Sequence, residues 1–154
     1  MRIAISADHG GVELKIALVD YIQGLGYELV DFGTDSEESV DYPDYAEKVG
    51  KAIQDQEVEK GIAICGSGVG VCITANKMKG VYAAICHDTY SARQGVEHDN
   101  MNVLCLGGRV IDVELGKELV KAFLDANFSG NDPGNERHLR RVTKIRKIED
   151  EEIN

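Results

Sequence analysis

A cysteine followed by three alternating glycines is the part of the sequence with the clearest chemical meaning. Residues 65–70 read Cys-Gly-Ser-Gly-Val-Gly and follow an apolar run that begins at Gly61. Glycines at this spacing let several backbone N–H groups point the same way at the start of a helix, and such a turn binds anions. The same groups favour a thiolate over a thiol, so Cys65 is either a reactive cysteine at an anion site or a buried strand residue.

Two histidines could join Cys65 in acid–base chemistry. His9 follows the first apolar run of the chain, and His98 comes shortly before the last one. Each could instead cap a helix or lie exposed in a turn. We expect His98 in a turn and at the same edge of the sheet as His9 and Cys65, and this convergence favours a shared site.

The basic residues are concentrated near the C-terminus. The formal net charge is -10, yet six of the 17 Lys and Arg residues lie between Arg137 and Lys147. Arg137 and Arg141 are one helical turn apart and could clamp a phosphate together, or could belong to a solvated helix face. The acidic overall charge argues against a nucleic-acid partner, because phosphate backbones attract basic surfaces.

Other chemistries do not fit the spacing. A dinucleotide fingerprint needs a third glycine at its sixth position, which is Val71 when counted from Gly66 and Ile73 when counted from Gly68. The P-loop lysine is missing, and no arginine closes the loop as in a cysteine phosphatase. The histidines and cysteines show no metal-ligand spacing, so we expect neither a metal nor a cofactor.

These residues must be positioned by short apolar runs that alternate with helix-like segments. Strands that alternate with helices predict an α/β fold with a parallel sheet, and ligands of such sheets bind beyond the carboxyl ends of the strands. Cys65 lies at such an end. The predicted strands are residues 2–6, 27–32, 61–65, 81–86 and 102–106, and helical spacing marks residues 12–25, 113–124 and about 137–150.

Length and composition predict a single domain, residues 1–154, because 154 residues with 43% hydrophobic content are too few for two ordinary cores. We expect the helix at about 137–150 to dock on the core or on a partner subunit. Residues 34–41 and 127–136 are candidate mobile loops.

The sequence also predicts a cytoplasmic protein without a membrane partner. The N-terminus lacks a signal-peptide pattern, and no apolar run approaches the roughly 20 residues that span a bilayer. The cysteines contain no Cys-x-x-Cys pair, which favours reduced thiols. We expect Cys72, Cys86 and Cys105 to pack in the core.

Motifs stand along nearly the whole chain, at residues 6–11, 40–46, 65–70, 75–77, 108–110 and 137–138. Together they resemble the ribose-5-phosphate isomerase type B family, which also contains galactose-6-phosphate and allose-6-phosphate isomerases. The resemblance implies a Rossmann-like three-layer domain with a five-stranded parallel sheet, and a homodimer or dimer of dimers with active sites shared across the interface. It implies a metal-free aldose–ketose isomerase of the pentose phosphate pathway.

The resemblance further implies roles for individual residues. Cys65 would move a proton between C2 and C1 of D-ribose 5-phosphate and D-ribulose 5-phosphate through an enediolate. His98 would assist opening of the furanose ring, with Ser67 nearby. The substrate-binding residues that it implies are Asp8 and Tyr42 at the hydroxyls, Gly66, Gly68, Val69 and Gly70 at the enediolate, and His9, Arg109, Arg137 and Arg141 around the phosphate.

Two features depart from the family pattern. Asp99 follows His98 where the family has Asn, so we expect its carboxylate to turn away and Asn100 or Asn102 to supply any amide contact to substrate. The loop before Arg137 is also longer than usual. One branch of the family has a Glu base at the place of Val71, so this chain resembles the cysteine branch.

Two alternatives stay open at this point. The substrate could be a six-carbon sugar, allose or galactose 6-phosphate, because the sequence does not rank the residues that set pocket depth. The chain could also be a non-catalytic nucleotide-binding module, with Asp88 as a ribose-binding acid after the fourth strand.

Overall fold

The sheet of this protein has five strands, all parallel, in the order β2-β1-β3-β5-β4. The structure is a computed structural model and describes residues 1–153. Each expected strand is present, with ends that differ by one or two residues. The strands are β1 (Arg2–Ala7), β2 (Glu28–Asp31), β3 (Lys60–Cys65), β4 (Ala83–Ile85) and β5 (Val103–Gly107).

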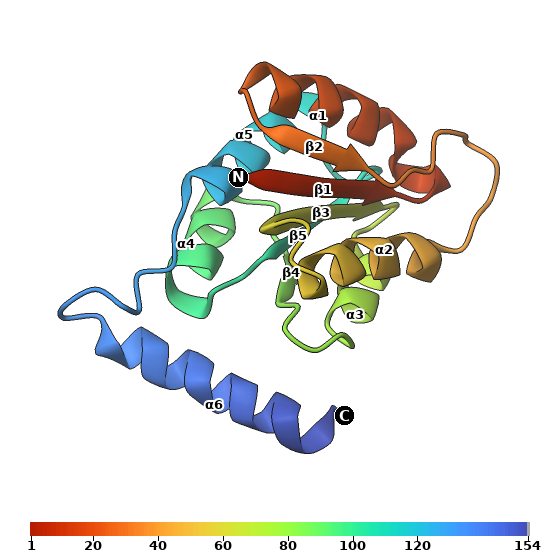
Figure 1. Cartoon of the computed structure of the whole chain (residues 1–154). Coiled ribbons are helices and arrows are strands. Elements are labelled where there is room, and N and C mark those ends of the chain that lie inside the picture. Colours follow the sequence, from red (N-terminus) through yellow and green to blue (C-terminus); the bar gives the residue numbers. More distant parts are fainter. Residues whose placement is uncertain (154) are drawn as a thin grey trace.

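Helices cover both faces of the sheet, which gives three layers (Figure 1). On one face lie α1 (Val12–Gly24), α4 (Thr89–Asp99) and α5 (Val113–Asp125), and on the other lie α2 (Tyr42–Gln54) and α3 (Val69–Ala75). A short 3-10 helix, η1 (His9–Gly11), joins β1 to α1. The expected α/β class and parallel sheet are therefore confirmed.

The core is divided by the sheet because successive side chains of a strand point to opposite faces. Large residues such as Ile5, Ile64 and Leu106 face α1, α4 and α5. Small residues, Ala4 and Ala63, face α2 and α3 instead, which lets those helices approach closely. Cys65 belongs to this second face, so its side chain points toward α3.

Helix α6 (Glu136–Glu152) lies outside the three layers and runs along one side of the molecule (Figure 1). Its first half contacts α4, and its last turns bind the loop between α3 and β4. The Glu149 carboxylate accepts hydrogen bonds from the Gly80 N–H at 2.8 Å and the Tyr82 hydroxyl at 3.2 Å. The helix thus contacts the core of its own chain, one of the two expected arrangements.

On its outer side, the edge strand β4 is bordered by a side chain and not by another strand. Asn76, just after α3, accepts a hydrogen bond from the Ala83 N–H at 2.9 Å and donates one to the Ala83 carbonyl at 2.8 Å. On the inner side, the Asn102 side-chain oxygen accepts a hydrogen bond from the Tyr82 N–H, and the strand begins at Ala83, two residues after the predicted start.

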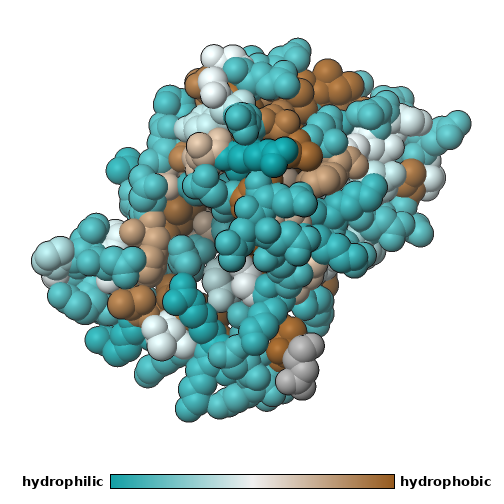
Figure 2. All heavy atoms as spheres, viewed as in Figure 1, coloured by the Kyte–Doolittle hydropathy of each residue, from teal (hydrophilic) through white to brown (hydrophobic). Residues whose placement is uncertain are grey.

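The molecular surface is mostly hydrophilic in the view of Figure 2, with apolar residues in small groups. Among residues 1–153, no helix combines the length and apolar character needed to cross a membrane.

Candidate active site

Cys65 ends β3 and is 4% exposed, with its sulfur held by the turn that follows. The Gly68 N–H donates a hydrogen bond to Cys65 Sγ at 3.1 Å. Gly68 adopts a φ of 83°, which favours glycine, and a Cβ there would lie 3.1 Å from the Leu106 backbone. The alternating glycines therefore aim an N–H at sulfur and start α3, which together favour negative charge at this place.

Backbone segments from three strand ends meet beside Cys65. The Gly108 N–H donates to the Cys65 carbonyl at 2.8 Å, and the Arg109 N–H donates to the Gly66 carbonyl at 3.0 Å. A Cβ on Gly108 would stand 2.5 Å from the Gly10 oxygen. Glycine is required here because the loops after β1, β3 and β5 approach too closely for a side chain.

A cavity of about 430 Å³ opens over this point, and seven of the predicted site residues line it. Tyr42, the first residue of α2, packs on Gly70, where a Cβ would lie 2.6 Å from the ring. The Arg109 side chain lies over Gly66. The cavity is lined by Asp8, Tyr42, Cys65, Gly66, Ser67, Gly70, Arg109 and Val110.

Two polar side chains in the cavity also shape its backbone. Asp8 is 6% exposed and accepts the Gly10 N–H at 2.9 Å, which caps η1. The Ser67 hydroxyl accepts the Val69 N–H at 3.2 Å. Both residues can therefore orient a ligand only with the hydrogen-bonding capacity that these contacts leave free.

His9 lies in an adjoining cavity of about 340 Å³, which Arg109 also lines. Its Nδ1 accepts the Val40 N–H at 3.1 Å, so segment 34–41 is bonded to η1. Glu37 from that segment lines the same cavity. His9 and Arg109 are thus close enough to the Cys65 cavity to meet the charged end of an extended ligand.

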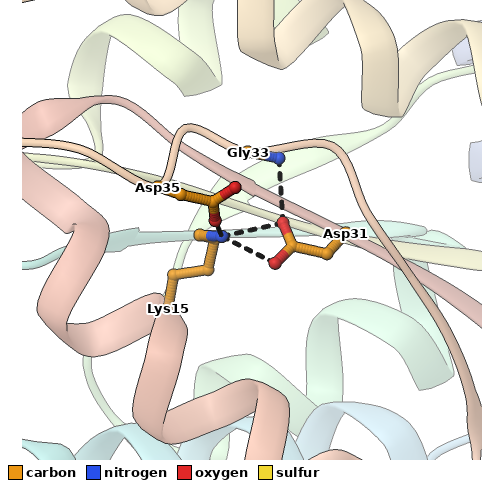
Figure 3. A network of polar contacts seen from close by, with 4 residues as sticks. All are labelled: Lys15, Asp31, Gly33 and Asp35. Carbon is orange, nitrogen blue, oxygen red and sulfur yellow. Dashed lines mark hydrogen bonds and ion pairs between the residues drawn. The ribbon is translucent and has the colours of Figure 1, made fainter.

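A buried lysine anchors segment 34–41 at its other end. Lys15 is 1% exposed and pairs with Asp31 at 2.6 Å and Asp35 at 2.7 Å, and Asp31 also accepts the Gly33 N–H at 2.8 Å (Figure 3). Burial opposes the charge, but the bonds and charges of the two carboxylates outweigh it and raise the pKa of Lys15. The expected mobile loop is therefore bonded at both ends.

The expectation that His98 shares the edge of Cys65 is wrong. His98 belongs to the last helical turn of α4 and not to a connecting loop, and β5 begins only at Val103. A helix between two parallel strands returns the chain to the amino edge of the sheet, and Figure 1 shows the end of α4 on that side. Asp99 and Asn100 follow His98 there, and Asn100 ends α4 with a φ of 55°.

Arg137 and Arg141 also lie away from the Cys65 cavity, on exposed positions of α6. Arg137 donates to the Gly134 carbonyl at 2.9 Å. Between them, His138 is buried and stacks on His98, with ring centroids 3.9 Å apart. One chain thus holds two groups of predicted site residues, one at each edge of its sheet.

Asp99 lines a small cavity of about 230 Å³ with Met101 and Ile145, separate from the Cys65 cavity. The Asp88 carboxylate accepts the Ser91 N–H at 2.7 Å and caps α4, which lowers the pKa of Asp88. An acid committed to a helix cap is a poor ribose ligand, so this contact weighs against the nucleotide-binding alternative.

The remaining cysteines differ in exposure. Cys86 and Cys105 are buried as expected, and burial raises the pKa of Cys86 to about 11. Cys72 is only half-buried in α3, and a hydrogen bond with the Cys105 thiol lowers the pKa of Cys72 to about 7, with help from Asn76. Among residues 1–153, no group of three or more His, Cys, Asp or Glu could hold a metal ion.

Sequence reasoning missed several residues that shape the site. His138 falls within the motif at residues 137–138 and Lys15 within the helical segment 12–25, and neither pattern indicates a buried polar contact. His87 follows β4, and its Nε2 accepts the Gly107 N–H at 3.1 Å, which ties the ends of β4 and β5 together. Burial lowers the pKa of His87 and so favours this neutral acceptor. Only the position of His87 after a strand could have indicated such a role.

Fold and site together describe an α/β protein with a cysteine and an N–H cradle at the carboxyl edge of a parallel sheet. The sequence pattern of the family described as Ribose/Galactose Isomerase matches residues 3–145. The chain therefore belongs to this family.

Individual relatives are similar over nearly their whole length. Ribose-5-phosphate isomerase B of Escherichia coli (strain K12) is 43% identical over 148 residues, 96% of each chain. D-erythrulose-4-phosphate isomerase of Pectobacterium atrosepticum is 45% identical over 131 residues, 84% of this chain and 86% of that one. The solved structure of ribose-5-phosphate isomerase B from Clostridium thermocellum matches with a TM-score of 0.93 and 45% identity, covering 98% of this chain and 99% of that chain.

Proposed function

We propose that this protein interconverts D-ribose 5-phosphate and D-ribulose 5-phosphate, with Cys65 as the base. The observation that carries the proposal is the Gly68 N–H at 3.1 Å from Cys65 Sγ, in a cavity that Asp8 and Tyr42 line. Family membership and the names of the relatives support the reaction class.

The reaction follows from this arrangement. The thiolate takes the proton from C2 of the open-chain aldose, and the carbonyl at C1 becomes an enediolate oxygen. The N–H groups of the Gly66–Gly70 turn stabilise that negative charge as it develops. Cys65 then returns the proton to C1 while the hydroxyl proton passes from O2 to O1, which gives the ketose.

We further propose a homodimer, or a dimer of dimers, in which a second copy supplies His98, Arg137 and Arg141 to the Cys65 cavity. A single chain holds these residues at the opposite edge of its sheet, so its own site lacks them. In support, Val69 and Ile73 on α3, beside the glycine turn, are 48% and 59% exposed. Apolar side chains grouped at such exposure are typical of a protein contact surface.

The size of the sugar is the finer part of the proposal. The cavity of about 430 Å³ accommodates a small sugar phosphate, and the relatives' names include isomerases of both a five-carbon and a four-carbon sugar. A six-carbon 6-phosphate sugar is the remaining candidate from the sequence. We place the enzyme in the cytoplasm, because a phosphorylated sugar does not cross the membrane and is available there.

The test is a panel of sugar phosphates in deuterated water, with the pure protein and NMR detection of deuterium at C1 and C2. We expect solvent deuterium in both sugars and the highest kcat/KM for ribose 5-phosphate over erythrose 4-phosphate and allose or galactose 6-phosphate. Absence of deuterium incorporation with every sugar, together with tight binding of adenine nucleotides, would refute the proposal in favour of a nucleotide-binding module.

A further inference from the structure

We propose that His138 is a positioning residue that fixes the ring of His98 for its part in opening the sugar ring. The inference deepens the isomerase function proposed above and rests on the role given there to His98.

The two rings form a parallel stack. Their centroids are 3.9 Å apart and their planes differ by 16°. His138 is 3% exposed, although Arg137 and Arg141 on either side of it are exposed. The imidazole of His138 therefore faces α4 and is largely shielded from solvent.

A second contact holds His98 at its edge. The Gln94 amide nitrogen lies 3.0 Å from His98 Nδ1. An amide nitrogen only donates, so Nδ1 is the acceptor, and Nε2 is left to exchange a proton with a substrate. With one face stacked and one nitrogen bonded, the ring is restricted to a single orientation.

The backbone around His138 is fastened to the same turn of α4. Both the N–H and the hydroxyl of Ser129 donate to the Glu97 carbonyl, at 2.9 and 2.8 Å, next to His98 in sequence. Val142, one turn after His138, is 1% exposed. The segment before α6 and the first turns of α6 are therefore held against the end of α4, and the ring stack is one of several contacts there.

The charge state of His138 suits this role. Burial lowers the pKa of His138, the nearby His98, Arg137 and Arg141 lower it further, and Asp99 acts in the opposite direction. A neutral His138 can cover His98 without repelling a proton that His98 takes up or delivers.

The experiment separates ring opening from proton transfer at carbon. Ribose 5-phosphate is mostly cyclic, whereas ribulose 5-phosphate is open-chain because its C5 oxygen carries the phosphate. Net conversion of the aldose needs both steps. Exchange of solvent deuterium into C1 of the bound ketose uses Cys65 and the cradle and needs no ring opening. Replacing a residue that positions His98 should therefore lower the rate of net aldose conversion more than the rate of deuterium exchange at C1 of the ketose.

We expect His138→Ala to lower net turnover by about 10-fold or more while exchange at C1 changes by less than about 3-fold. His138→Phe keeps a ring against His98 and should retain net turnover within about 3-fold of the parent. The matched control is Arg140→Ala, an exposed position on the same helix, which should change neither rate. Thermal unfolding establishes that each variant is folded, and the His98 ring-proton shifts should move in His138→Ala but not in Arg140→Ala.

Equal losses of both rates in His138→Ala and in His138→Phe would overturn the inference, because a phosphate-binding or purely structural residue has that effect. Full net turnover in His138→Ala would also overturn it. His98→Asn is the reference: it should show the same split, and adding His138→Ala to it should cost nothing more. If His98→Asn itself shows no split, the role proposed for His98 fails; if it does and His138→Ala does not, only the inference fails.

Discussion

Cys65 and Cys72 lie close together in sequence, yet their sulfurs meet different surroundings. Cys65 Sγ receives the Gly68 N–H and lines the cavity with Asp8. Cys72 Sγ lies 3.6 Å from the Ala83 carbonyl, on the side of the edge strand. The pKa of about 7 for Cys72 therefore makes it ionisable without bringing it to the substrate.

At this scale we predict that Cys65→Ala lowers kcat by a factor of about 10² to 10⁴, the usual contribution of a positioned proton acceptor. The fold should persist, because only one small side chain is removed from a cavity wall. Cys72→Ala is the matched control and should retain kcat within about threefold. Steady-state kinetics with circular dichroism decides the matter. Near-normal turnover in Cys65→Ala, or its loss in Cys72→Ala, would show that the base is misassigned.

Asn100 gives a second prediction, because its backbone is left-handed at the end of α4. Asn100→Ala should lower the free energy of unfolding by about 1 kcal/mol, whereas Asn100→Gly, which also removes the amide, should be close to neutral. Chemical denaturation measures both. If the two variants are equally stable, the left-handed conformation does not explain the Asn. Turnover is a separate measurement: a loss that both variants share would indicate an amide contact with substrate.

At the scale of elements, a buried lysine joins a strand to a helix. Lys60 begins β3, and its Nζ donates to the carbonyls of Phe123 and Ala126 at 2.7 Å each, at the end of α5. These carbonyls have no partner inside the helix, so the ammonium caps them. Burial lowers the pKa of Lys60 from 10.5 to about 8, with Asp125 and Glu59 acting in the opposite direction.

This shift predicts a pH dependence of stability. Between pH 8 and 10.5 the folded chain has released the Lys60 proton while the unfolded chain still binds it, so the free energy of unfolding should rise with pH through this window. Lys60→Met lacks the effect. Urea unfolding at both ends of the window should show the parent gaining stability relative to the variant. If the difference in the free energy of unfolding between the parent and Lys60→Met is the same at both pH values, Lys60 is not the titrating group.

Helices with large apolar residues at regular spacing, such as α1, α5 and α6, can be predicted from the sequence. Large apolar residues do not mark helix α2, because its buried positions hold the smaller side chains of Ala46, Val49 and Ala52. The glycine turn at Cys65 was predictable from local spacing alone. The edge on which His98 lies was not, because that depends on the path of α4, and the stack with His138 joins segments that are distant in sequence.

At the scale of the whole molecule, the two groups of site residues lie at opposite edges of one sheet. No rearrangement of loops within one chain brings His98 across the sheet to Cys65, because α4 and β5 fix its position. Symmetric pairing of two copies does so twice at once, since each copy offers what the other lacks. The dimer is therefore proposed as a requirement for activity.

Mixing two inactive variants tests this arrangement. Cys65→Ala and His98→Asn should each be nearly inactive, but a heterodimer has one site with both substitutions and one with neither. An equal mixture, after subunit exchange, should recover up to about a quarter of parental activity. Adding Ile73→Glu to both variants should prevent the recovery, whereas Ile16→Glu, at a similarly exposed position on the other face, should not. Recovery that never exceeds the sum of the two variants would show that each chain completes its own site.

The side chain of Asn76 has a consequence for how such copies can meet. It occupies the outward N–H and carbonyl of Ala83, the groups through which a foreign strand would extend the sheet. Ordered aggregation by backbone pairing is thereby blocked at this border. Growth into fibrils is disfavoured there, and any specific assembly along β4 must be built from side chains, whose shapes can be matched to a single partner.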